Sequence, residues 1–177
     1  PPMKVNAQLK SLLQARLHDP FSFLGAHQTN GSWIVRAFAP FSEKLWLQTG
    51  DGWEDMQKTD PHGLFEWRGK EAPPAPRRLR HLQNGVLKTG HDPYSFPSTL
   101  SEHDLFLFGE GRLYRGYDML GAQPMESLGI AGVRFAVWAP NAERVSVVGD
   151  FNHWDGRIHA MRSLGSSGVW EIFIPGL

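Results

Sequence analysis

The sequence of 177 residues contains no cysteine, which excludes a disulfide-stapled scaffold and a zinc ribbon and suits a reducing cytosol. It has no excess of charge, because 18 basic and 18 acidic residues cancel, so nothing predicts binding to nucleic acid or to a membrane. No hydrophobic run approaches membrane-spanning length, and the first residues lack the apolar stretch of a signal peptide. We therefore expect a cytoplasmic protein with a neutral partner.

The first half of the chain reads as one helix followed by strands. Apolar residues recur at helical spacing between Val5 and Leu17, which predicts an N-terminal helix within residues 1–17 that ends before Asp19-Pro20. Strand patterns follow, and Asn30-Gly31 and Asn84-Gly85 are typical of hairpin turns. The predicted strands in this half are 33–38, 45–47 and 64–67.

The second half is organised around residues 133–157. Apolar residues alternate with others over 133–138, which is typical of a strand with one buried face, and Pro140 then breaks the run. A returning strand is predicted at 145–148, followed by a loop at 150–156 that is polar apart from two aromatics. One of them, Trp154, could stack on the apolar face of a sugar ring.

An internal repeat connects the two halves. With a shift of 100 residues, Phe38-Ala39-Pro40 falls on Trp138-Ala139-Pro140, and with small length changes Trp53 pairs with Trp154 and 63–66 with 168–171. We therefore predict a mainly β fold with two tandem immunoglobulin-like β-sandwich modules. The expected boundaries are 1–17 for the helix, 18–100 for the first module, 101–128 for a linker with short helices, and 129–177 for the second module. The second module lacks a counterpart to the strands after residue 67, so we expect it to be incomplete and the chain to be part of a longer protein.

Several motifs carry a resemblance to a known family. WAPNAERVSVVGDFNHWDG at 138–156 resembles the signature of the family 48 carbohydrate-binding module, which precedes the catalytic barrel in glycogen branching enzymes and related α-glucan enzymes. HDPFSFLG at 18–25, HDPYSF at 91–96 and DLFLFGEGRLYRGYDMLGAQPM at 104–125 are similar to the N-terminal region of bacterial 1,4-α-glucan branching enzymes. The resemblance covers nearly the whole chain.

The resemblance implies a parent enzyme that cuts an α-1,4 bond of a glucan and transfers the chain to a 6-hydroxyl, creating an α-1,6 branch in glycogen. This chain would be its non-catalytic N-terminal region, which binds or guides α-1,4-glucan, and the downstream catalytic barrel would be its partner in the same polypeptide. No cofactor and no metal site are implied, and we expect a monomer that binds neither nucleic acid nor membrane.

Three residues of the 150–156 loop are the candidate carbohydrate-binding residues. Trp154 matches a tryptophan that contacts α-glucan in modules of the resembled family, although a tryptophan here could instead fill the end of the sandwich core. Asn152 and Asp155 flank it and could bond sugar hydroxyls, although both residue types also suit turns. Trp53 lies in the equivalent loop of the first module, where the GDFN text is lost, so that module either binds sugar or is a spacer.

No catalytic residue is predicted in this chain. Glycosyl transfer of the α-amylase type needs a nucleophile and an acid/base carboxylate facing each other across a cleft, and the resemblance puts both in the downstream barrel. Two alternatives to a branching enzyme stay open at this point. The same module precedes α-glucan debranching and trehalose-releasing hydrolases, and it also occurs in non-enzymatic glycogen-binding proteins.

Overall fold

The computed structural model describes residues 2–50, 52–111 and 116–177. The chain divides into two compact units: unit 1 comprises Pro1–Pro20 with Pro97–Leu177, and unit 2 comprises Phe21–Phe96. Strands make up most of the regular structure of the chain, which confirms the predicted mainly β fold. Among the described residues, no helix is both long and apolar enough to cross a membrane.

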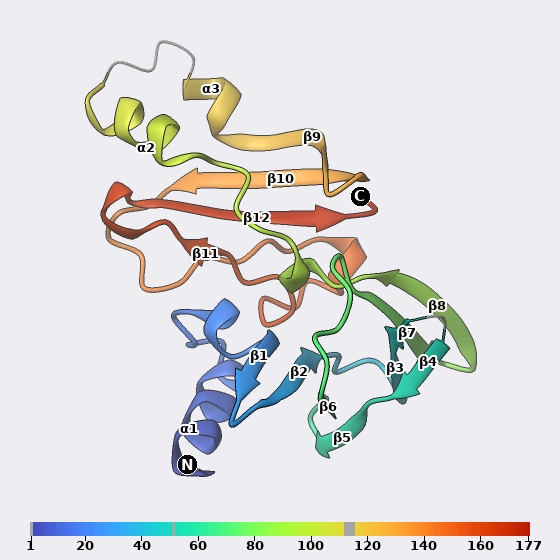
Figure 1. Cartoon of the computed structure of the whole chain (residues 1–177). Helices are drawn as coiled ribbons and strands as arrows, with labels where there is room; N and C mark the ends of the chain where they lie inside the picture. Colours follow the sequence, from blue (N-terminus) through green and yellow to red (C-terminus); the bar gives the residue numbers. More distant parts are fainter. Residues whose placement is uncertain (1, 51, 112–115) are drawn as a thin grey trace. The chain divides into compact units, whose positions relative to one another are not determined.

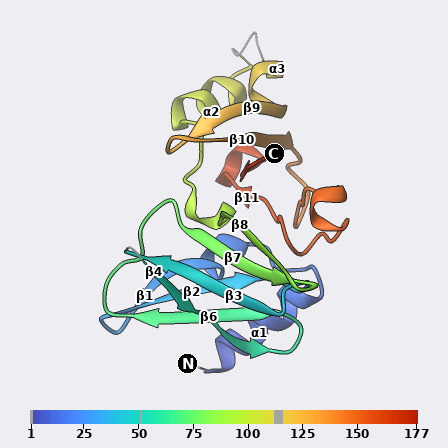
Figure 2. The same cartoon turned by 90° about the vertical axis from the view of Figure 1, so that its right-hand side faces the viewer.

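Unit 2 is a sandwich of two four-stranded antiparallel sheets (Figure 2). Their strand orders are β1-β2-β6-β5 and β4-β3-β7-β8. The strands are β1 (Gly25–Thr29), β2 (Ser32–Phe38), β3 (Lys44–Thr49), β4 (Gly52–Asp55), β5 (Gln57–Asp60), β6 (Leu64–Gly69), β7 (Arg78–Gln83) and β8 (Val86–His91), with the single-turn helices η1 (Pro20–Ser22) and η2 (Pro93–Ser95) at its ends.

The core of unit 2 follows from the period of two along its strands. Val35 and Ala37 of β2, and Leu45 and Leu47 of β3, are buried in one cluster, because alternate side chains of each strand face the same side. Strand β6 contributes Phe65 to the same cluster. These are the residues that the alternating sequence pattern places on the inward face.

Both predicted hairpin turns of unit 2 are confirmed. Asn30 and Gly31 have φ of 51° and 78°, and Asn84 and Gly85 have φ of 50° and 75°. Positive φ at both central positions defines the type I′ turn, which Asn-Gly favours because asparagine and glycine tolerate the left-handed region. The first turn joins β1 to β2 and the second joins β7 to β8.

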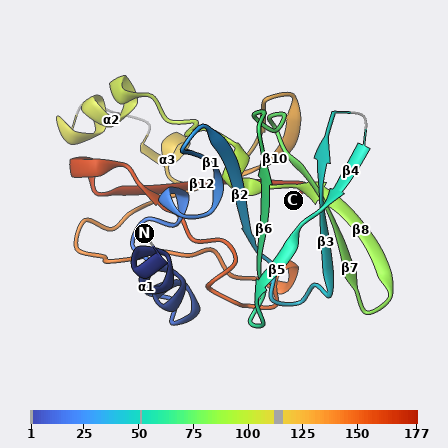
Figure 3. The same ribbon diagram turned by 60° about the horizontal axis from the view of Figure 1, so that its bottom comes forward.

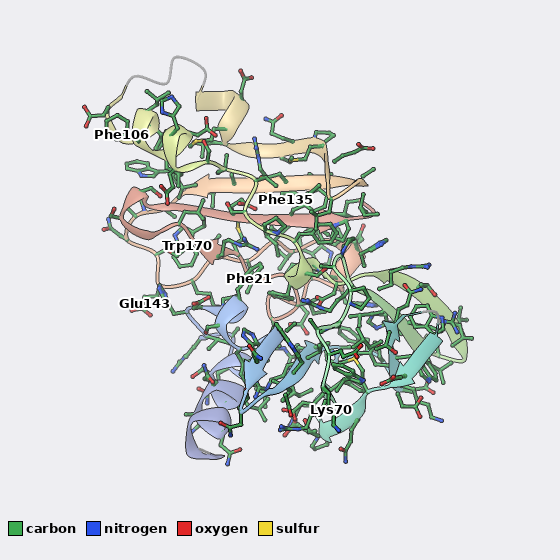
Figure 4. The ribbon with its side chains drawn as sticks, viewed as in Figure 1. Phe21, Lys70, Phe106, Phe135, Glu143 and Trp170 are labelled. Atoms are coloured by element: carbon green, nitrogen blue, oxygen red, sulfur yellow. The ribbon has the colours of Figure 1, made fainter. Side chains whose placement is uncertain are left out.

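Unit 1 contains one four-stranded sheet with the order β11-β12-β10-β9 (Figure 1). Phe135 and Trp170, labelled in Figure 4, come from the adjacent strands β10 and β12. The elements of unit 1 are α1 (Pro2–Leu13), α2 (Glu102–Gly109), α3 (Gly116–Met119), β9 (Gly121–Ser127), β10 (Ile130–Trp138), η3 (Asp150–Asn152), β11 (Arg162–Ser163), η4 (Gly165–Ser167) and β12 (Val169–Pro175).

The sheet of unit 1 repeats one sheet of unit 2 strand for strand. The order β9-β10-β12-β11 matches β1-β2-β6-β5, and the register agrees as well: Arg36 faces Glu66 in one sheet and Ala136 faces Glu171 in the other. The corner after the long strand is also repeated. Ala39 N donates to Gly63 O at 2.8 Å, and Ala139 N donates to Gly168 O at 2.8 Å. The predicted internal repeat is therefore confirmed in hydrogen bonding as well as in hydrophobic phase.

The N-terminal helix ends earlier than its periodicity predicts. Helix α1 covers Pro2–Leu13 rather than reaching Leu17 (Figure 3). Ala15 has φ of 55°, its N–H donates to Leu12 O, and Arg16 N donates to Ser11 O. These two bonds form a Schellman motif with alanine at the left-handed position. Glycine is the usual residue there, so the residue type does not indicate that the helix ends at this point.

The segment 101–128 contains short helices, as predicted, and also a strand that was not predicted. Helix α2 begins with a capping box in which Ser101 Oγ accepts from Asp104 N at 3.1 Å. Strand β9 was missed because it contains Pro124 and lacks an apolar alternation, yet it pairs along β10 from Ser127 to Gly121. Gly121 has φ of 88°, close to the 87° of Gly25 at the start of β1, and the shared text Leu-Gly-Ala was the available signal.

The predicted returning strand at 145–148 forms only a short ladder. Ser146 and Ala160 form an isolated bridge, Val147 N donates to His159 O at 3.0 Å, and Met161 N donates to Val145 O at 2.9 Å. Its counterpart β3 pairs with β4 on one side and with β7 on the other. Within the described part of unit 1, the 145–148 segment has this pairing on one side, so the valine pattern predicted more regular structure than is found.

Candidate functional site

The corner at Ala139-Pro140 anchors the loop that follows. Trp170 Nε1 donates to Ala139 O at 3.0 Å, and Ala142 N donates to Ala139 O at 3.1 Å. Gly168 approaches this corner with φ of 73°, and a Cβ there would lie 2.8 Å from Pro140 Cβ. A side chain at Gly168 would be both strained and crowded, which explains glycine at this position.

Asn152 is buried and holds the loop from inside. Its exposed fraction is 2%, its Oδ1 accepts from Gly149 N at 2.9 Å, and its Nδ2 donates to Val147 O at 2.8 Å. The same Nδ2 lies 2.9 Å from His159 Nδ1. Its amide is therefore used within the protein, whereas a residue that bonds sugar hydroxyls would present its amide to solvent.

His159 is the acceptor for that amide. Burial lowers the pKa of His159 from 6.5 to about 4, so its ring is neutral at pH 7 and Nδ1 keeps the lone pair that accepts from Asn152. The Phe151 ring lies against it, with 5.6 Å between ring centroids, and packs over Gly149, where a Cβ would come 2.6 Å from the ring. The inner side of the loop is thus a closed network.

Trp154 lies on the outer side of the loop and is 65% exposed. His153 and Trp154 have φ of 55° and 57°, a conformation uncommon for residues other than glycine, asparagine and aspartate. Trp154 N donates to Gly149 O at 3.0 Å, and its indole Nε1 donates to Asp150 Oδ1 at 2.9 Å. The backbone turns the ring outward, so Trp154 does not fill the core.

Asp155 is engaged by Arg157. Arg157 Nε donates to Asp155 Oδ1 at 2.9 Å and Nη2 donates to Oδ2 at 2.7 Å, a bidentate pair. Hydrogen bonds from Arg157 hold the pKa of the Asp155 carboxyl below its usual value. The carboxylate oxygens can accept further bonds, but their orientation is set by Arg157.

In the equivalent loop of unit 2, arginine side chains lie close to the ring of the tryptophan, Trp53. The Arg80 guanidinium lies 4.2 Å from the centroid of the Trp53 ring, and that of Arg78 lies 5.8 Å from it. A cation over an aromatic ring is attracted by the π electrons. At least one face of the Trp53 ring is therefore engaged within unit 2.

The sequence predicts that Trp154, Asn152 and Asp155 form one carbohydrate-binding site, but in the structure the three side chains have different environments. Trp154 is exposed, Asn152 is buried, and Asp155 is paired. The sequence interpretation missed Asp150, and its available signal was the carboxylate four residues before the tryptophan. In the described ranges, no group of three or more histidine and acidic residues could hold a metal ion.

This fold and this loop define a class, the β-sandwich carbohydrate-binding module. The family model described as carbohydrate-binding module 48 (isoamylase N-terminal domain) matches residues 119–177, which include Trp154. A second model, the N-terminal domain of the alpha-1,4-glucan branching enzyme GlgB, matches residues 5–94. The chain belongs to the GlgB branching enzyme family and represents its N-terminal region.

Curated relatives extend the match over the whole chain. The 1,4-alpha-glucan branching enzyme GlgB of Methylobacillus flagellatus is 56% identical over 174 residues, which are 98% of this chain and 24% of the relative. The protein of the same name from Nitrosospira multiformis is 54% identical over 100% of this chain and 24% of its own length. The protein of the same name from Rubrobacter xylanophilus is 44% identical over 99% of this chain and 24% of its own length. The chain spans about a quarter of the length of these relatives.

Proposed function

We propose that this chain is the glucan-binding, non-catalytic N-terminal region of a 1,4-α-glucan branching enzyme. The observation that carries the proposal is Trp154, an indole ring that is 65% exposed on a closed loop whose inner side is fully bonded. An aromatic face held outward suits the apolar face of a glucosyl unit. The match to the N-terminal domain of the alpha-1,4-glucan branching enzyme GlgB supports the proposed substrate class, an α-1,4-glucan or glycogen chain.

The parent enzyme would cut an α-1,4 bond, hold the chain as a glycosyl-enzyme, and transfer it to a 6-hydroxyl. A retaining mechanism requires two carboxyl groups about 5–5.5 Å apart, one as nucleophile and one as acid/base. The match to the first quarter of the relatives supports a catalytic barrel as the partner of this region in the same polypeptide. Binding at Trp154 would keep a long glucan near that barrel, which raises its effective concentration there.

Within the site, we assign sugar stacking to Trp154 and loop support to Asn152. Asp155 remains the candidate for a hydrogen bond from a sugar hydroxyl, because a carboxylate paired to Arg157 still has acceptor capacity. Unit 2 serves as a spacer, because Arg80 lies over the Trp53 ring.

The family matches favour a branching enzyme over the two alternatives, a related hydrolase and a non-enzymatic glycogen-binding protein. A debranching or trehalose-releasing hydrolase would share the module matched at 119–177, but the match at 5–94 is to the branching enzyme N-terminal domain. A non-enzymatic glycogen-binding protein would not account for curated relatives that are four times as long. We also propose that the protein is cytoplasmic, which the absence of cysteine supports, and that it is a monomer.

The experiment is isothermal titration of the chain with maltoheptaose, using Trp154→Ala and the matched Trp53→Ala, with circular dichroism to establish folding. We expect saturable binding that Trp154→Ala reduces at least tenfold and that Trp53→Ala leaves within twofold, because the Trp53 ring is engaged by arginine. Equal binding by the wild type and a folded Trp154→Ala would refute the assignment of this site.

A further inference from the structure

We infer that Asp150 is a positioning residue of the glucan site, whose carboxylate fixes the Trp154 ring with one face presented to the sugar. This inference rests on the proposed glucan binding at Trp154. Trp154 is 65% exposed, so packing alone does not set its side-chain torsions. Its indole Nε1 donates to Asp150 Oδ1 at 2.9 Å, a bond to a charged acceptor.

Asp150 can orient the ring because the same turn fixes its own backbone. Asn152 N donates to Gly149 O at 3.2 Å, and Trp154 N donates to that oxygen at 3.0 Å. The Asn152 side chain in turn accepts from Gly149 N at 2.9 Å through its Oδ1. The backbones of Asp150 and Trp154 therefore both belong to one hydrogen-bonded turn. The side-chain bond between them consequently sets the orientation of the ring relative to the loop.

The bond also determines how Trp154 can recognise a glucan. The indole N–H is a donor without acceptor capacity, and Asp150 already accepts its one hydrogen bond. Trp154 is therefore left to act through its ring face and not through a hydrogen bond to a particular hydroxyl. A ring face accepts any glucosyl unit along an α-1,4 chain, which suits a surface that must bind internal segments of a long polymer.

The expected effect follows from the ordering of one side chain. Without the Asp150 bond, the Trp154 ring samples several rotamers, and a ligand must select one of them on binding. Immobilising one such side chain lowers affinity by about two- to tenfold. We expect Asp150→Ala to weaken maltoheptaose binding by this factor, and Asp150→Asn, which keeps a side-chain oxygen as acceptor, to weaken it by less than about twofold.

The test combines two measurements on the 177-residue chain. The indole N–H resonance of Trp154 is assigned by its loss in Trp154→Phe, and it is then compared between wild type, Asp150→Ala and Asp150→Asn without ligand. Affinity for maltoheptaose is measured for the same variants. Glu126→Gln, which removes an exposed carboxylate of β9, is the matched control for loss of one negative charge in unit 1.

We expect the Trp154 indole resonance to move in Asp150→Ala, to move less in Asp150→Asn, and to stay unchanged in Glu126→Gln. An unchanged indole resonance with unchanged affinity in Asp150→Ala would overturn the inference. An unchanged resonance with weaker binding would also overturn it, because Asp150 would then contact glucan directly. Absence of maltoheptaose binding by the wild type would refute the proposed glucan site, while the resonance would still show whether Asp150 orients the ring.

Discussion

Replacement of His159 by glutamine should remove a pH dependence from the stability of unit 1. Burial lowers the folded-state pKa of His159 from 6.5 to about 4, so the unfolded chain takes up a proton below pH 6.5 that the folded chain does not take up until about pH 4. The free energy of unfolding therefore falls as the pH drops through this window. The gap between the two pKa values corresponds to about 3 kcal/mol, at about 1.4 kcal/mol per pH unit.

The structural reason is the bond between Asn152 Nδ2 and His159 Nδ1 at 2.9 Å. A protonated Nδ1 has no lone pair, so it cannot accept from the amide. Glutamine carries an oxygen that can accept from the same amide and does not titrate. Between pH 7 and pH 4, His159→Gln should lose about 3 kcal/mol less stability than wild type, with carboxylate titrations common to both proteins.

The assay is urea unfolding at several pH values, followed by resonances of unit 1. The Val147 and Met161 amides are suitable because their hydrogen bonds join the strand segments on either side of the loop. His81 provides a matched histidine in unit 2, where burial, with a contribution from Lys88, also lowers the pKa to about 4. His81→Gln should flatten the pH dependence of unit 2 resonances alone. A stability difference between wild type and His159→Gln that stays constant from pH 7 to pH 4 would refute the reasoning.

Two further predictions concern the corner of unit 1 and the loop of unit 2. Gly168→Ala should destabilise unit 1 by about 2–4 kcal/mol in urea unfolding, because the new Cβ combines a φ of 73° with a distance of 2.8 Å to Pro140 Cβ; a loss below about 1 kcal/mol would contradict this. Arg80→Ala should uncover the Trp53 ring, and acrylamide quenching of tryptophan fluorescence should rise relative to Lys88→Ala, a matched removal of a cation from β8. Equal quenching in the two variants would show that Arg80 does not shield the ring.

Periodicity and turn chemistry account for much of the fold that the sequence predicted. Asn-Gly turns, alternating strands and the repeat of 100 residues depend on local rules that each stretch obeys by itself. The end of α1 at an alanine and the strand β9 around Pro124 were missed, because in both places hydrogen bonding overrides the usual residue preference. At the site, the sequence predicted the loop and its tryptophan. The residue types of the loop did not predict that Asn152 faces inward. Its burial depends on partners outside the loop, such as His159, whose position is known only from the structure.

The repeat also shows how one architecture can be used in two ways. The two sheets share strand order and register, and Glu66 and Glu171 occupy the same position in them. Glu66 is paired with Arg36, whereas Glu171 faces Ala136 and accepts instead from Ser98 Oγ and Thr99 N. A buried carboxylate needs donors, and where alanine stands in place of arginine, the segment that leads into α2 supplies donors to one oxygen of Glu171.

The loops of the two units also differ in which charged side chain contacts their tryptophan. In unit 2 an arginine of β7, two strands away in the sheet, lies over the ring of Trp53, and in unit 1 the indole of Trp154 is bonded at its edge to Asp150. A cation over the face leaves little room for a sugar, whereas a carboxylate at the edge leaves the face available. If this contrast determines which module binds glucan, Arg80→Ala should open the Trp53 face without creating strong maltoheptaose binding, because the GDFN text that precedes Trp154 is lost before Trp53. Binding by Arg80→Ala as tight as that of the Trp154 site would show that access alone, and not ring orientation, limits glucan binding.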